Sequence, residues 1–77
     1  MGAPAYRTVL IGAGNVATRL RQALADAGHQ VTSVGGRTRI QPVPRDADVY
    51  IIAVSDRSIA SVARELTGVS GLVVHTA

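Results

Sequence analysis

The residues whose types and spacing most directly suggest chemistry form the run Gly12-Ala13-Gly14-Asn15-Val16-Ala17. Its spacing is GxGxxA, a variant of the glycine pattern that binds the pyrophosphate of dinucleotides. Gly12 would permit a tight turn, Gly14 would let the backbone approach a phosphate without a Cβ in the way, and Ala17 would keep helix and strand close. The alternative is a turn that uses glycine for backbone geometry alone.

The elements on either side of this run fit a phosphate site. Tyr6 to Ile11 ends in an unbroken apolar run, which predicts a strand buried on both faces of a parallel sheet. After the loop, apolar residues recur every three or four positions up to Ala27, which predicts an amphipathic helix that ends at Gly28. The first N–H groups of a helix have no partner within it, and the helix dipole also favours an anion there.

A second strand is predicted at 30–34, and the residues after it suggest which dinucleotide would bind. No acidic residue lies between Asp26 and Asp46, so the usual carboxylate for the adenosine ribose hydroxyls is missing. Instead, Arg37, Thr38 and Arg39 offer cationic and neutral donors that suit a 2′-phosphate. We therefore expect NADP to be preferred over NAD, the alternative being a solvated Gly-Gly-Arg turn.

The rest of the chain predicts one irregular connection and three further elements. Prolines at 42 and 44 exclude a regular helix, so an irregular crossover is expected in place of a second helix, with a helical turn considered at 44–47. Apolar runs predict strands at 49–54 and 72–75. The apolar spacing from Ile59 to Leu66 predicts a helix between them, with Asp56 or Ser58 as its N-cap.

This order of elements predicts an α/β fold, a truncated Rossmann-like three-layer arrangement. Right-handed crossovers place the glycine strand in the middle of a four-stranded parallel sheet of order 2-1-3-4 with two main helices. The 77 residues would form a single, partial NAD(P)-binding domain with residues 1–5 as a loose lead-in. The expected cofactor-binding residues then cluster at the carboxyl edge of the sheet: Gly12, Ala13, Gly14, Asn15, Val16, Arg37, Thr38, Arg39, Ala53, Val54, Ser55, Asp56 and His75.

Composition narrows the classes of function. The chain is 47% hydrophobic and 17% charged, with no apolar run of the roughly 18 residues that cross a membrane and no recognisable signal peptide, so we expect a cytoplasmic globular protein. It has no cysteine, and its two histidines lack metal-ligand spacing, so no metal is expected. The net charge of +3 comes with only two aromatic residues, which makes nucleic-acid binding an unfavoured alternative.

Several blocks together resemble a known family. The chain looks like the N-terminal part of a family of bacterial Rossmann-like proteins whose second domain is helical and functionally unassigned. The family is itself similar to pyrroline-5-carboxylate reductase and to the deazaflavin-linked NADP reductases. The resemblance rests on Leu-Ile-Gly-Ala-Gly-Asn-Val-Ala at 10–17, Ala-Gly-His at 27–29, Gly-Arg-Thr at 36–38, Asp-Ala-Asp-Val-Tyr-Ile-Ile-Ala-Val-Ser-Asp at 46–56 and Val-His-Thr-Ala at 74–77.

The resemblance implies an NADP-linked oxidoreductase. It places 12–16 at the pyrophosphate, Arg37 and Thr38 at the 2′-phosphate, 53–56 near a ribose and 75–77 near the nicotinamide. Relatives carry more chain between the Arg-Thr turn and the Asp-Ala-Asp block, and they continue into a substrate domain, so this chain resembles a shortened form without turnover of its own. His75 is the one weak candidate for acid or base catalysis, the alternative being a structural histidine.

A second class of function remains open. The chain could be a minimal scaffold whose glycine loop binds no cofactor and which self-associates. The predicted loss of a helix leaves apolar strand faces thinly covered, and the last strand exposes an edge. A homo-oligomer is therefore expected on either interpretation.

Overall fold

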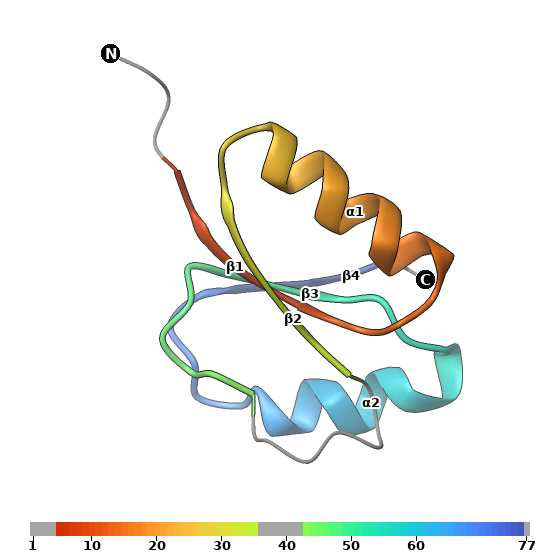
Figure 1. The fold of residues 1–77 in the computed structure, drawn as a ribbon. Coiled ribbons are helices and arrows are strands. Elements are labelled where there is room, and N and C mark those ends of the chain that lie inside the picture. The colour runs from red at the N-terminus through yellow and green to blue at the C-terminus, as the bar shows by residue number, and fades with distance from the viewer. Residues whose placement is uncertain (1–4, 36–42, 77) are drawn as a thin grey trace.

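The computed structural model describes residues 5–35 and 43–76, which form four strands and two helices (Figure 1). In chain order these are β1 (Arg7–Ile11), α1 (Asn15–Asp26), β2 (Gln30–Val34), β3 (Val49–Ile52), α2 (Asp56–Glu65) and β4 (Leu72–His75).

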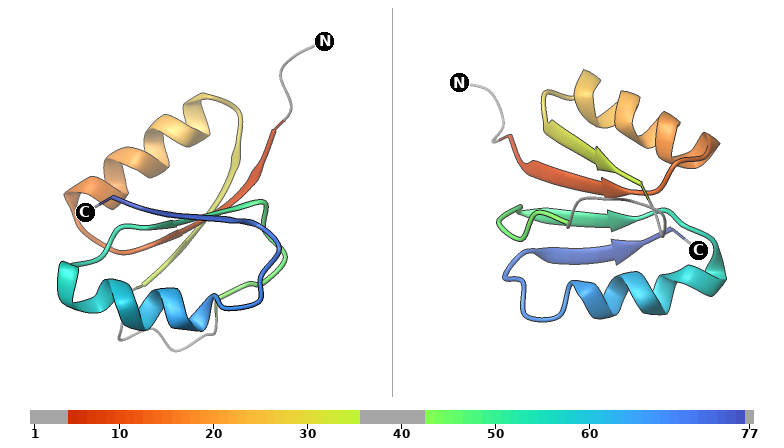
Figure 2. Two further views of the ribbon diagram at one scale, coloured as in Figure 1. Left: turned by 180° about the vertical axis from the view of Figure 1, so that it is seen from behind. Right: turned by 60° about the horizontal axis from the view of Figure 1, so that its bottom comes forward.

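The four strands make one parallel sheet of order β2-β1-β3-β4, as predicted. Strand β1 lies in the middle, with Leu10 opposite Ser33 of β2 and opposite Ile51 of β3. The connection through α1 runs from β1 to β2, and the connection through α2 runs in the opposite direction across the sheet, from β3 to β4. The two helices consequently lie on opposite faces of the sheet (Figure 2). All four strands point the same way, so their carboxyl ends share one edge.

The main core lies on the α2 face of the sheet. Side chains on a strand alternate between faces, and alternate positions of β1 and β3 face α2 here. Tyr50 and Ile52 are completely or almost completely buried, and Val62 and Leu66 of α2 pack on the same cluster. The other core members are Val9, Ile11, Val43 and Ala47.

The α1 face is covered less fully. Leu10 and Thr8 of β1 are buried there, and Ala17 is the only buried residue of α1. The small Ala17 side chain suits the close helix–strand packing that was expected of it. Helix α1 covers β1 and β2, whereas the β3–β4 half of this face has no helix over it within the described residues (Figure 2).

Several local predictions need correction. Strand β3 ends at Ile52 and not at 54, and no helical turn forms at 44–47. The N-cap of α2 is Ser55, because Asp56 already begins the helix. Helix α1 ends at Asp26 with Ala27 as its C-cap, and Gly28 follows just beyond the helix with a φ of +91°. After α1, the His29 N–H donates to the carbonyl of Leu24 at 3.0 Å, and its Nδ1 accepts the Tyr6 N–H at 3.1 Å.

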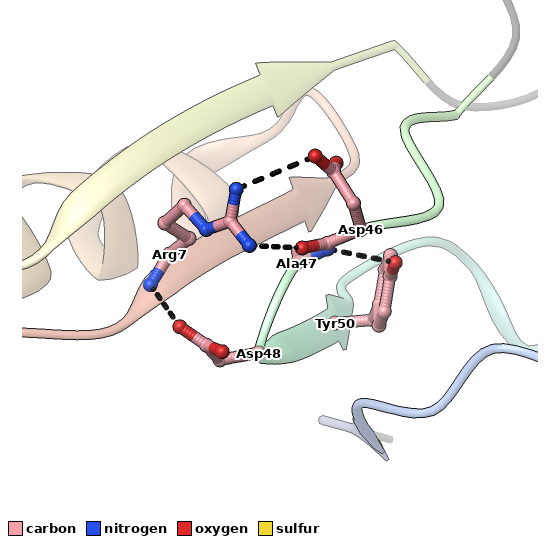
Figure 3. Close-up of polar contacts among 5 residues, drawn as sticks. All are labelled: Arg7, Asp46, Ala47, Asp48 and Tyr50. Carbon is pink, nitrogen blue, oxygen red and sulfur yellow. Dashed lines mark hydrogen bonds and ion pairs between the residues drawn. The ribbon is translucent and has the colours of Figure 1, made fainter.

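At the amino edge of the sheet, Arg7 holds the segment that leads into β3 (Figure 3). The Arg7 N–H donates to Asp48 Oδ2 at 2.8 Å, and its guanidinium donates to the Asp46 carbonyl at 2.7 Å. The guanidinium also forms an ion pair with the Asp46 carboxylate at 3.3 Å. Because that pair is exposed, it is worth at most about 1 kcal/mol, and the bonds to backbone groups contribute more to the geometry.

Arg45 ties the same segment to the end of α2. Its guanidinium donates to the carbonyls of Glu65 at 2.7 Å and Thr67 at 2.6 Å. The last carbonyls of a helix have no partner within it and carry partial negative charge, so an arginine is well suited to bind them. The segment from 45 to 48 is thereby fixed at both β1 and α2 without forming a regular element.

The buried hydroxyl of Tyr50 gives a test of this arrangement. It accepts the N–H of Ala47 at 3.1 Å, inside the core (Figure 3). In Tyr50→Phe that N–H loses its acceptor while the ring still fills its site, so the free energy of unfolding should fall by about 1–3 kcal/mol. Urea denaturation followed by circular dichroism would measure the change.

The matched control is Tyr6→Phe, because Tyr6 is half exposed. This change should leave the stability within about 0.5 kcal/mol of the parent, as is usual at the surface. Equal stability of Tyr50→Phe and the parent would mean that the Ala47–Tyr50 bond contributes nothing to the fold.

Candidate functional site

Three strand ends meet at the carboxyl edge beside Gly12. The Gly12 N–H donates to the carbonyl of Val34 at the end of β2, at 3.0 Å. On the other side, the Ala53 N–H after β3 donates to the carbonyl of Ile11 at 2.8 Å. The order of the strands reverses here, because β2 lies to one side of β1 and β3 to the other. Open α/β sheets bind their ligands at this kind of switch point.

Gly12 is required by the backbone itself. Its φ is +145°, a conformation that residues with a side chain rarely adopt. A Cβ at this position would also collide with the carbonyl oxygen of Ala53 and lie 2.9 Å from its carbonyl carbon. The first glycine of the pattern therefore has the structural role expected of it, a tight turn between two strand ends.

Gly14 differs, because nothing in the fold requires a glycine there. Its φ of −130° and ψ of −170° are ordinary extended values, and a Cβ would have no atom within 4 Å. Gly14 is the N-cap of α1, and its carbonyl accepts hydrogen bonds from both the N–H and the Oγ1–H of Thr18, each at 3.0 Å. The space beside the second glycine is therefore open, as an approaching phosphate would need.

The first turn of α1 has the electrostatics of an anion site. No side chain caps the helix, and its first turn contains no acidic residue. Residues 13–16 are all exposed, and Val16 keeps 56% of its surface accessible. The N-terminal N–H groups and the partial positive charge of the helix dipole are thus turned toward solvent at the carboxyl edge.

Helix α2 also begins at this edge, but its N-terminus is less suited to an anion. Asp56 lies in its first turn and places a carboxylate where the dipole is positive. Ser55, the N-cap, is exposed, and its carbonyl accepts the N–H of Ser58 at 2.8 Å. Ala53 and Val54 are half-buried between Gly12 and the start of α2. The expected residues 53–56 therefore lie beside the glycine loop, with Asp56 better suited to a hydroxyl than to a phosphate.

His75 is farther from the loop. It is the last residue of β4 and lies opposite Ile52 in the neighbouring strand. Since β3 separates β4 from β1, His75 lies about two strand spacings, roughly 10 Å, from the end of β1. His75 therefore lies at the carboxyl edge of the sheet, as expected, but away from Gly12 and Gly14.

The residues expected at a 2′-phosphate, Arg37, Thr38 and Arg39, lie outside the described part of the chain. Strand β2, which precedes them, ends at Val34 in direct contact with Gly12. Their role as cofactor contacts stays a prediction.

The sequence-based prediction missed the contacts of Arg7, which lie at the opposite edge of the sheet. A cavity of about 220 Å³ lies at that edge, lined in part by Arg7, Gln30 and Thr32. The available signal was a pair of oppositely charged residues where two buried strands start: Arg7 is the first residue of β1, and Asp48 directly precedes β3. The positive charge of Arg7 is already paired with Asp46. This cavity is therefore a less favourable site for the phosphates of a dinucleotide than the glycine loop.

Within residues 5–35 and 43–76, no three His, Cys, Asp or Glu side chains are grouped so that they could hold a metal ion. Neither helix of this part is long and apolar enough to span a membrane. No known family model, curated protein or solved structure matches the chain.

The contrast between the two glycines gives a stability prediction. Gly12→Ala combines a disfavoured φ with a collision against backbone, so it should lower the free energy of unfolding by at least about 2 kcal/mol. Gly14→Ala meets neither problem and should change it by less than about 1 kcal/mol. Thermal and urea unfolding of both variants would measure the difference, and equal destabilisation would contradict the loop geometry described above.

Proposed function

We propose that this chain is an NADP(H)-binding Rossmann-like module related to NADP-dependent oxidoreductases. The observation that carries the proposal is the open, uncapped N-terminus of α1 beside the Gly12–Gly14 loop, at the point where the strand order reverses. The topology is Rossmann-like. The pyrophosphate would bind to the N–H groups at the start of α1, with Gly14 allowing its close approach.

The choice between the two helix N-termini supports this position of the phosphates. Both helices begin at the carboxyl edge, but only α2 has a carboxylate in its first turn. An anion bound at α1 meets no opposing charge there, whereas one bound at α2 would meet Asp56. In the proposed complex Asp56 and Ser55 instead face a ribose, where hydroxyl groups can donate and accept hydrogen bonds.

The adenosine end of the proposal rests on the sequence after β2. Arg37 and Arg39 would pair with a 2′-phosphate, and no acidic residue lies between the end of the strand and Asp46 to repel it. The resemblance to NADP reductases points the same way. The module would position the dinucleotide, whose nicotinamide supplies the hydride chemistry, while substrate groups would come from outside these 77 residues.

Isothermal titration of the chain with NADP tests the proposal directly. We expect saturable binding to the parent and at least a roughly tenfold weaker affinity in Gly14→Ala, because the added Cβ occupies the approach of the pyrophosphate. The fold offers no reason for Gly14→Ala to unfold. Circular dichroism of the same samples would confirm that both are folded.

Two results would contradict this proposal. One is the absence of binding to a folded parent chain. The other is equal affinity of the parent and Gly14→Ala, since binding would then occur without the glycine loop.

The preference for NADP over NAD is tested separately. Arg37→Ala should weaken NADP binding at least tenfold and leave NAD binding almost unchanged, because only NADP carries the 2′-phosphate. Arg64→Ala removes the same charge from the last turn of α2 and serves as the matched control. If both arginine variants lost affinity equally, the effect would be one of overall charge and not of a 2′-phosphate site.

A further inference from the structure

Strand β4 forms an exposed apolar edge of the sheet. Within residues 5–35 and 43–76 it pairs with β3 on one side only, and Leu72, Val73 and Val74 keep 62%, 37% and 38% of their surfaces accessible. The sequence from 66 to 76 contains no Asp, Glu, Lys or Arg. Proteins commonly protect such an edge with charged residues or proline, and neither is present in β4.

The hydrogen bonds to β3 show which backbone groups of β4 face outward. The N–H of Leu72 donates to Asp48 at 2.9 Å, and the N–H of Thr76 donates to Ile52 at 3.1 Å. In a parallel strand, alternate residues direct both backbone groups to the same neighbour, so even-numbered residues face β3. The N–H and C=O of Val73 therefore point to the free edge.

We infer that β4 pairs with β4 of a second copy of this chain, antiparallel and about a two-fold axis at Val73. The two Val73 residues exchange both of their backbone hydrogen bonds. Leu72 then lies directly opposite Val74 of the partner, on the α1 face of both sheets. The three exposed apolar side chains thus meet only apolar side chains, and an eight-stranded sheet results.

The register follows from the side chains. An axis at Val74 also satisfies the outward backbone, but it places Leu72 opposite Thr76 and Val73 opposite His75 of the partner. The two Val74 residues then form the one directly opposed apolar pair among Leu72, Val73 and Val74. Directly opposed apolar side chains stabilise antiparallel strands, so the axis at Val73 is preferred.

A second copy suits this edge better than other occupants. Residues 66–76 carry no charge that could pair with a charged partner. Two copies of this chain, each with a net charge of +3, repel each other least where they meet at an uncharged strand. The other edge of the sheet, β2, carries the polar sequence Gln-Val-Thr-Ser-Val and offers no comparable apolar run. The inference does not depend on dinucleotide binding.

Sedimentation equilibrium over a range of concentrations gives the first test. The parent chain should approach twice the monomer mass, and Val73→Pro should raise the dissociation constant of the dimer at least tenfold. Proline removes the outward N–H, which takes no part in pairing with β3, so the monomer fold should persist. Val73→Thr keeps that N–H and a β-branched side chain, and as the matched control it should still dimerise.

Engineered cysteines test the register, because the chain has none of its own. Leu72→Cys and Val74→Cys chains, mixed and oxidised, should form the mixed disulfide in at least several-fold excess over either homodimer. Directly opposed residues of a non-hydrogen-bonded pair have Cα atoms about 4.5 Å apart, close enough for a disulfide. This test remains valid if Val73→Pro fails to fold.

Three results would overturn the inference. One is a parent chain that stays monomeric at all concentrations, and another is a mass that rises without limit, which would indicate head-to-tail pairing of β4 with β2. The third is a disulfide between two Val74→Cys chains in place of the mixed product, which would place the axis at Val74.

Discussion

At Gly12 the chain leaves the sheet between two neighbouring strand ends, where there is no room for a side chain. The Gly12 N–H is bound to Val34 on one side, and Ala53 is bound to Ile11 on the other. This crowding requires glycine, and it also determines where α1 begins. Because the turn is so tight, the helix starts three residues later with its N-terminal groups at the carboxyl edge. The same constraint thus joins the strands and exposes the proposed phosphate site.

The two edges of the sheet are built differently. At the amino edge, Arg7, Asp48 and Arg45 bind backbone groups of other elements and hold the irregular segment before β3. At the carboxyl edge, the contacts between strands are backbone bonds, and residues 13–16 are exposed. Side chains that stabilise the fold are therefore separated from those proposed to bind ligand. Such a separation allows a change at Gly14 to alter the affinity for a ligand without loss of the core.

Much of the fold could be predicted from the sequence, because β1, β3 and β4 are short and largely apolar runs and β2 is rich in Val and Thr. The bounds of β2 and β4 were predicted without error, and the strand order followed from parallel pairing and the handedness of crossovers. The glycine loop was recognisable because φ and close packing limit which residues fit there. The fold confirms this for Gly12, whereas the role of Gly14 as a phosphate contact stays a prediction.

The sequence was less informative where side chains bind distant backbone. The hydrogen bonds of Arg7 and Arg45 join residues about 20 to 40 positions apart, and no local pattern marks such pairs. The N-cap of α2 was misplaced for a related reason, since Ser55, Asp56 and Ser58 are all good capping residues. The backbone after β3 decides among them, because Ser55 is extended, with φ of −63° and ψ of 155°, and Asp56 is already helical.

The proposed dimer and the proposed cofactor site would act independently, and the reason is geometric. In an antiparallel β4–β4 pair the strands of the two copies point in opposite directions, so their carboxyl edges lie at opposite ends of the joined sheet. Within each copy, β1 is separated from the dimer axis by β3 and β4. The glycine loops would therefore neither touch each other nor touch the interface. Dimerisation would add stability to a small domain, which buries little surface by itself, without altering the site at which the dinucleotide binds.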